Sequence, residues 1–166
     1  MAKRKNKKGS LIDLIGIGTA LLAVAIVVLI GFKVSDEINT EFQANDNIPT
    51  AGKTAYSTIN DYFPTVMDNT FLFLLIGLSI VALVLASLVR VHPVFFVLYL
   101  VMLVIIIFLS GIFSNIYLEI AGNAEFSAYA DQLIFITHIM HFLPFIIGIV
   151  GFILSIIMYK NWSEGL

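Results

Sequence analysis

The sequence predicts an all-α integral membrane protein with four transmembrane helices and an outer loop that contains an amphipathic helix. Of the 166 residues, 60% are hydrophobic and 12% are charged, and the mean hydropathy is +1.01. A soluble domain carries about 25% charged residues, and a chain this short has too small an interior to bury so many apolar side chains. The composition therefore excludes both a soluble globule and a disordered chain.

The apolar residues gather in four continuous runs, each long enough to cross a bilayer. A spanning helix needs about 20 such residues, and the runs predict spans at residues 11–32, 69–89, 94–116 and 133–159. None of the runs alternates polar and apolar residues as a membrane β-strand does. Each is therefore expected to be a helix, and the last is long enough to tilt or kink.

The basic residues predict how the spans are oriented. They lie mainly in the N-terminal tail (1–10), the tight inner turn (90–93) and the C-terminal tail (160–166), whereas most acidic residues lie in the loops 33–68 and 117–132. Lysine and arginine are retained on the cytoplasmic side of a membrane. Both termini of this multi-pass protein are therefore expected on that side, and the acidic loops on the opposite side.

The loop 33–68 is expected to begin as a continuation of the first helix. Val34, Ile38 and Phe42 are spaced four apart, which places one apolar stripe along a helix that extends past the membrane. Residues 45–49, with the sequence Asn-Asp-Asn-Ile-Pro, then supply turn-forming side chains that end it.

The rest of this loop predicts a separate helix on the membrane surface. Tyr56, Ile59 and Phe63 recur at the spacing of a short amphipathic helix that lies in the interface. Pro64 and then Asp68 indicate the start of the second span. At the other end of that span, the proline of the 90–93 turn predicts a close antiparallel pairing of the second and third spans.

Each span contains small residues spaced four apart. The pairs are Gly16 with Ala20, Ala82 with Ala86, Ser110 with Ser114, and Gly151 with Ser155. Helices associate in lipid through close packing rather than through the hydrophobic effect, so small residues indicate contact surfaces. These pairs predict packing within the bundle or, alternatively, lateral contacts with other subunits.

His138 and His141 lie three residues apart on one face of the fourth span. An ionisable residue within a membrane is a functional candidate. With Glu119 and Asp131 expected at the same end, the pair could bind a divalent metal or relay protons. Hydrogen-bonded packing is the alternative that we favour, and no cofactor is expected.

Asp13 lies one turn inside the basic side of the first span. An unpaired carboxylate at that depth is costly, so a basic partner is expected. Arg90, at the end of a neighbouring span, is the predicted partner. We expect this pair to fix the order of the helices rather than to serve transport.

The N-terminal tail is a basic cluster without aromatic residues, made of Lys3, Arg4, Lys5, Lys7 and Lys8. Such a cluster attracts anionic lipid headgroups or the phosphates of nucleic acid. It supplies charge but no folded element that could read bases. Contact with nucleic acid is therefore expected to be non-specific.

The sequence contains none of the common catalytic motifs. It has no glycine-rich phosphate loop, no nucleophile elbow and no His-Glu-x-x-His helix. It also has no cysteine, which excludes disulfides and thiol nucleophiles. The protein is expected not to be an enzyme.

Several features together resemble a known class of membrane protein. They are residues 90–96 (Arg-Val-His-Pro-Val-Phe-Phe), Ser114-Asn115 at the end of the third span, the basic-tailed first span and the acidic outer loop. Over most of the chain this layout resembles small multi-span membrane proteins of tailless, lipid-containing viruses. The resemblance implies a structural protein of a virion membrane, with both tails inside, the basic tail toward the genome and the acidic loop toward the capsid. It transfers no active-site residue.

The sequence therefore favours a non-enzymatic structural or assembly protein that acts through lateral or shell-facing protein contacts. Its partners are expected to be further copies, capsid proteins or complex subunits that contact residues 33–68. A small channel or proton-coupled carrier that uses His138 and His141 is one alternative. An accessory subunit of a larger membrane complex is another.

Overall fold

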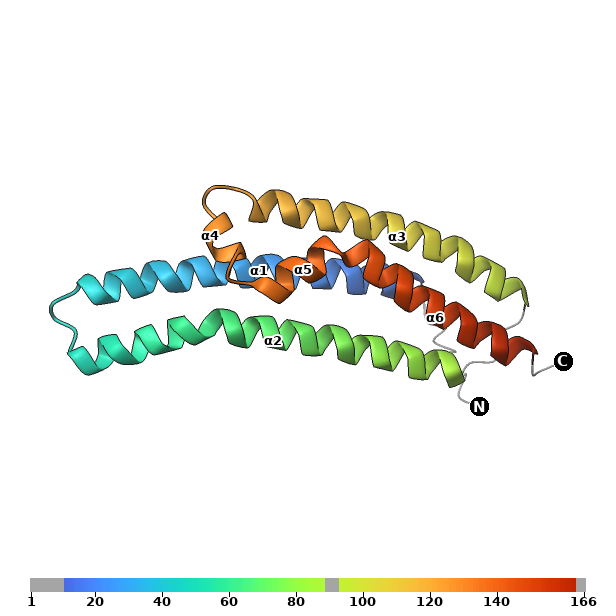
Figure 1. The fold of residues 1–166 in the computed structure, drawn as a ribbon, viewed down its shortest axis with the longest axis horizontal. Helices are drawn as coiled ribbons and strands as arrows, with labels where there is room; N and C mark the ends of the chain where they lie inside the picture. Colours follow the sequence, from blue (N-terminus) through green and yellow to red (C-terminus); the bar gives the residue numbers. More distant parts are fainter. Residues whose placement is uncertain (1–10, 89–92, 164–166) are drawn as a thin grey trace, which may run out of the picture.

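The computed structural model describes residues 11–88 and 93–163, and within these ranges the chain is helical with no strand. Four of its helices are long and apolar enough to cross a membrane. They run side by side in an elongated bundle (Figure 1). The predicted fold class, an all-α multi-pass membrane protein, is confirmed.

The four long helices form a ring. They are α1 (Leu11–Ala44), α2 (Thr50–Leu88), α3 (Pro93–Ala121) and α6 (Leu143–Ser163), with the short helices α4 (Ser127–Ala130) and α5 (Ile134–His141) between α3 and α6. Helix α1 packs against α2 and α3, and α6 packs against the same two helices. Helices α2 and α3 therefore lie diagonally across the ring, with α1 and α6 between them (Figure 1).

This order corrects the expected close pairing of the second and third spans. Each of these helices packs on α1 and α6, so inter-helix packing rather than closeness in the chain decides which helices are neighbours. The predicted turn itself falls almost entirely on residues 89–92, outside the described part of the chain.

Helices α1 and α2 are longer than a membrane span and project together beyond the other helices. They contain 34 and 39 residues, and the break between them falls on the turn-forming residues 45–49. There the Asn47 backbone N–H donates to Asn45 Oδ1 at 3.0 Å, and Lys53 Nζ donates to the Gln43 carbonyl at 2.7 Å. We call residues 33–63 the protruding hairpin (Figure 1).

The prediction of a separate helix on the membrane surface is wrong. Helix α2 is continuous from Thr50 to Leu88 and contains Pro64. A proline inside a helix removes one hydrogen bond and bends the helix, and Figure 1 shows α2 bent along its length. Tertiary packing holds the helix together across this point, because Phe63 stacks on Phe32 of α1 at 5.6 Å and Asn60 is buried.

The fourth apolar run is divided rather than continuous. Helix α5 ends at His141, and the membrane-spanning α6 begins at Leu143. Pro144 has no N–H to donate to the Met140 carbonyl, which interrupts the backbone ladder. The Ser114 hydroxyl donates to the His141 carbonyl at 3.2 Å and so satisfies one of the groups at the break.

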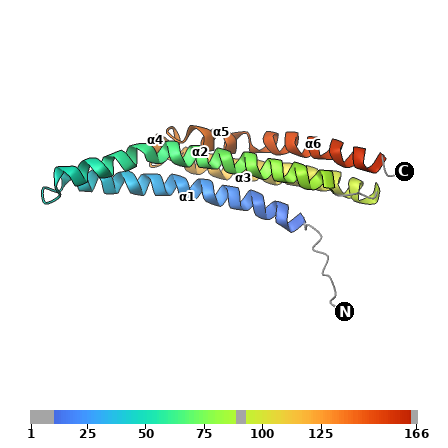
Figure 2. The same cartoon turned by 90° about the horizontal axis from the view of Figure 1, so that it is seen from below.

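The two ends of the bundle differ in how closely they are packed. We call the end that carries the protruding hairpin, α4 and α5 the hairpin end, and the end where α1 begins and α6 finishes the terminal end (Figures 1 and 2). The largest fully buried side chains are Leu29, Tyr117, Leu133, Ile136, Met140 and Leu143, together with Ser110. Most of them belong to the core where α4 and α5 pack against the long helices, so the core lies at the hairpin end.

Candidate functional site

The two histidines that the sequence offers for metal or proton binding, with hydrogen-bonded packing as the favoured alternative, lie on α5. His138 and His141 are both exposed on α5; His138 Nδ1 bonds to the Ile134 carbonyl at 2.9 Å, and the His141 ring packs edge-on against Phe142 at 4.6 Å. Among the described residues no three potential metal ligands come together. The pair therefore does not form, with Glu119 or Asp131, the cluster that a metal site needs.

Two other predicted sites lie outside the part of the chain that the structure describes. The basic residues Lys3, Arg4, Lys5, Lys7 and Lys8 fall in residues 1–10, and Arg90 falls in residues 89–92. The side chain of Asp13 is likewise not described. The basic tail and the Asp13–Arg90 pair therefore stay predictions.

The predicted small-residue pairs differ in their surroundings. Ser110, Ser114, Gly151 and Ser155 are all buried, Ala82 is half-buried and Ala20 is exposed, while the surroundings of Gly16 and Ala86 lie outside the described side chains. A methyl group on Gly151 would collide with Leu103, which marks a close approach of α3 and α6. On α1 it is Gly18 that faces α3, where an added Cβ would lie 3.1 Å from Phe113.

A buried carboxylate that the sequence did not single out for this role joins α2 to α5. Asp68 Oδ2 accepts the Phe135 N–H at 2.8 Å and Oδ1 accepts the Ile136 N–H at 2.9 Å. The first N–H groups of a helix have no partner within the helix and favour a negative charge. Asp68 thus caps α5 from another helix, a pairing across 67 positions that local sequence patterns do not reveal.

A second buried contact joins α3 to the segment that precedes α6. The Tyr117 hydroxyl lies 3.1 Å from Thr137 Oγ1, and Thr137 Oγ1 donates to the Ala130 carbonyl at 3.0 Å. Tyr117 is fully buried. This chain of hydroxyls fixes α4 and α5 against the membrane-spanning helix beside them.

A polar cluster ties the base of the protruding hairpin to the loop after α3. Lys33 Nζ lies 3.1 Å from Glu125 Oε2 and 3.7 Å from Glu37 Oε1, and it stands 5.0 Å above the Phe126 ring. The Tyr129 hydroxyl donates to Asp36 Oδ2 at 3.2 Å. Burial, and then this bond to the carboxylate, raise the pKa of Tyr129 above its ordinary value.

Above this cluster the protruding hairpin presents apolar and acidic side chains to its surroundings. Ile59 and Tyr62 are 62% and 65% exposed, and Phe42 stacks on Tyr56 at 5.0 Å across the two helices. The exposed acidic residues are Glu37, Glu41, Asp46 and Asp61. The hairpin is therefore a negatively charged surface that also carries large apolar groups.

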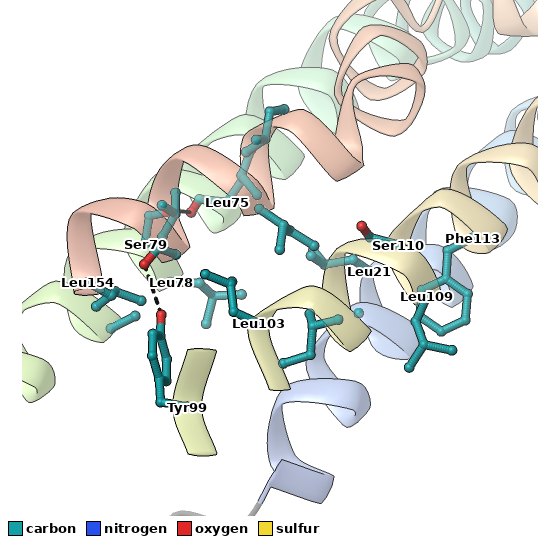
Figure 3. A pocket seen from close by; sticks show the side chains of 17 residues that line it. Leu21, Leu75, Leu78, Ser79, Tyr99, Leu103, Leu109, Ser110, Phe113 and Leu154 are labelled. Carbon is teal, nitrogen blue, oxygen red and sulfur yellow. Dashed lines mark hydrogen bonds between the residues drawn. The ribbon is translucent and has the colours of Figure 1, made fainter. Parts of the chain in front are cut away.

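The bundle also contains a cavity of about 150 Å³, lined by side chains from α1, α2, α3 and α6 (Figure 3). The lining consists of leucine, isoleucine, valine, phenylalanine and small residues, with hydroxyl groups only on Ser79, Tyr99 and Ser110. The Tyr99 hydroxyl donates to the Gly151 carbonyl at 3.0 Å (Figure 3). Among the residues that the structure describes, no ionisable acid or base other than this phenol lines the cavity.

Comparison with known proteins adds no relative to this picture: no family model, no curated protein and no solved structure matches the chain. Two features of the chain's own geometry bear on its function, namely the protruding hairpin and the apolar cavity.

Proposed function

We propose that the protein is a non-enzymatic structural or assembly protein of a membrane, and that its protruding hairpin docks onto a partner protein outside the bilayer. The observation that carries this proposal is the projection of α1 and α2 past the other helices. At about 1.5 Å per helical residue, the stretch from Lys33 to Ala44 alone adds about 18 Å to α1.

The chemistry of the hairpin supports a protein partner. Large apolar side chains exposed together outside a membrane are typical of interaction surfaces, and Ile59 and Tyr62 lie only three residues apart on α2. The exposed carboxylates beside them favour a partner surface with lysine or arginine, because opposite charges guide and orient association. The hairpin base is fixed to the bundle through Lys33 and Asp36. The docking surface is therefore preorganised, which lowers the entropy cost of binding a partner.

The resemblance to membrane proteins of lipid-containing viruses suggests what the partner is. In that setting the hairpin would contact the capsid shell, while both termini and the basic tail would face the virion interior and the genome. In a cellular membrane the same surface would contact a second subunit of a larger complex, and the termini would face the cytoplasm. Both settings require the same docking surface.

Co-purification in mild detergent from the source membrane tests the docking proposal. The variant carrying Ile59→Asp and Tyr62→Asp is expected to lose the chains that co-purify with the parent, because two charges replace the apolar contacts. Ala55→Asp, an exposed change on the same helix, is the matched control and is expected to retain them. Retention of the same chains by the double variant contradicts the proposal.

The conducting alternative has less support. The cavity is apolar, and the two histidines do not face carboxylates across it. Ions need polar or charged groups along their path. In a liposome flux assay, neither the parent nor the variant with His138→Leu and His141→Leu is expected to conduct ions. Flux in the parent that disappears in the variant would establish a channel or carrier instead.

A further inference from the structure

The lining of the cavity favours an apolar occupant. Its hydroxyl protons are already committed to backbone carbonyls: Tyr99 donates to Gly151, Ser79 donates to Leu75 at 2.8 Å, and Ser110 donates to Ile107 at 2.7 Å. An enclosed water needs two to four polar partners. Among the described lining residues these three hydroxyl protons are therefore not free to donate to a ligand, and nearly all of the remaining lining is hydrocarbon.

Small residues border the space from the two helices that face each other across it. Ser79 and Ala82 line it from α2, and Ser110 lines it from α3. Small residues in membrane helices ordinarily allow two backbones to pack closely. Here α2 and α3 stand diagonally across the ring, so the small side chains on these two helices border the open volume between them.

We propose that this cavity binds the end of a lipid acyl chain. An engineered apolar cavity of about 150 Å³ stays dry and binds benzene, so a cavity of this size accepts roughly six carbon atoms. The helices that line it are the candidate membrane spans, and the medium around them is therefore hydrocarbon. Leu78 lines the cavity and is 39% exposed, so a chain in the cavity would contact it.

A bound chain end would act as a packing element of the bundle. It would fill the volume between α2 and α3 and supply the dispersion contacts that the small residues leave unmade. The site is independent of the protruding hairpin, which lies at the opposite end of the molecule (Figure 1). It therefore stands or falls separately from the proposed docking function.

Photolabelling from within the bilayer tests this site. The purified protein is reconstituted into phosphatidylcholine vesicles that contain a phosphatidylcholine with a diazirine at the terminal carbon of one acyl chain, and labelled residues are mapped by mass spectrometry after irradiation. Ile106 lines the cavity and is 8% exposed, whereas Phe108, on the same helix, is 71% exposed to the surroundings. A chain end in the cavity labels both residues, and a chain confined to the outer surface labels Phe108 alone.

Filling the cavity provides the decisive comparison. Ala82→Leu places a larger side chain in the space and is expected to abolish labelling of Ile106 while labelling of Phe108 persists. Gly77→Leu, on the same helix but facing open space, is the matched control and is expected to label as the parent does. If Ala82→Leu does not fold, Ser79→Leu fills the same cavity from the adjacent turn. The proposal is overturned if Ile106 carries no label in the parent, or if its label survives in a folded cavity-filling variant.

Discussion

The hairpin end and the terminal end of the bundle are held together by different kinds of contact. At the hairpin end, polar side chains reach from one helix to another, as Asp68 does to α5 and Lys33 does to Glu125. At the terminal end, Tyr99 of α3 donates to the Gly151 carbonyl of α6, but Ser79 and Ser110 donate to carbonyls of their own helices and border a cavity. Polar contacts between helices are therefore denser at the hairpin end, and the open volume lies toward the terminal end.

The largest expected effect comes from removing the carboxylate that caps α5. Asp68→Ala leaves the buried N–H of Ile136 and the part-buried N–H of Phe135 without acceptors. A buried unsatisfied donor costs about 1–3 kcal/mol and a part-buried one costs less, so we expect the variant to lose roughly 2–4 kcal/mol of stability. Thermal unfolding in detergent measures the loss, and hydrogen exchange at these two amides localises it.

Two matched changes separate the capping role from a general effect of charge. Asp68→Asn retains one acceptor oxygen and is expected to lose about half as much, since one N–H keeps a partner. Asp61→Ala removes an exposed carboxylate seven positions earlier in the same helix and is expected to leave the melting temperature unchanged. Equal losses in the Asp68→Ala and Asp61→Ala variants would show that Asp68 does not act by capping α5.

A pair of leucine substitutions compares the packing of the two ends directly. Leu29 is fully buried on α1, whereas Leu78 borders the cavity on α2. Leu29→Ala creates a new void in a close-packed core and is expected to cost about 2–3 kcal/mol, because the cost rises with the volume of the void. Leu78 is 39% exposed and so loses fewer packing contacts on truncation, and Leu78→Ala is therefore expected to cost less than Leu29→Ala. Similar losses in the two variants would contradict a difference in packing between the ends.

The same contrast separates what the sequence predicts from what it does not. The number of membrane helices follows from apolar runs such as residues 94–116, because membrane insertion depends on local hydropathy. The continuity of α2 through Pro64 does not follow, since packing of Phe63 on Phe32 overrides a local helix breaker. The diagonal placement of α2 and α3 likewise depends on which surfaces meet, and a single sequence does not reveal this.

The candidate site shows the same division between local and long-range information. The extension of α1 into the protruding hairpin is predicted by Val34, Ile38 and Phe42 at helical spacing, a pattern within one helix. The Phe135 N–H that donates to Asp68 lies 67 positions from it in the chain, and Glu125 lies 92 positions from Lys33. No local spacing encodes either contact. The histidine pair was conspicuous in the sequence, yet the carboxylates expected beside it are not assembled around it.

A smaller effect is expected from the ion pair at the base of the protruding hairpin. Glu125 is largely exposed, and exposed ion pairs contribute little to stability because water and salt screen them. A double-mutant cycle with Lys33→Gln and Glu125→Gln is expected to give a small coupling that decreases as salt is added. A coupling that added salt does not reduce would mean that the hairpin base is as strongly fixed as the α5 cap.

The smallest expected effect is a change in how stability depends on pH. The pKa of Tyr129 is raised in the folded protein, by burial and by its bond to Asp36, whereas an unfolded tyrosine ionises at a pH of about 10. Below a pH of about 10, Tyr129 is protonated in both states and its bond to Asp36 contributes fully to the free energy of unfolding. Above that pH the tyrosine of the unfolded state loses its proton first, so stability falls as pH rises toward the folded pKa. Tyr129→Phe removes this contribution, and its melting temperature is expected to fall less steeply than that of the parent between about pH 9 and pH 11. An equal or steeper fall in the variant would show that the Tyr129–Asp36 bond does not help to hold the hairpin end together.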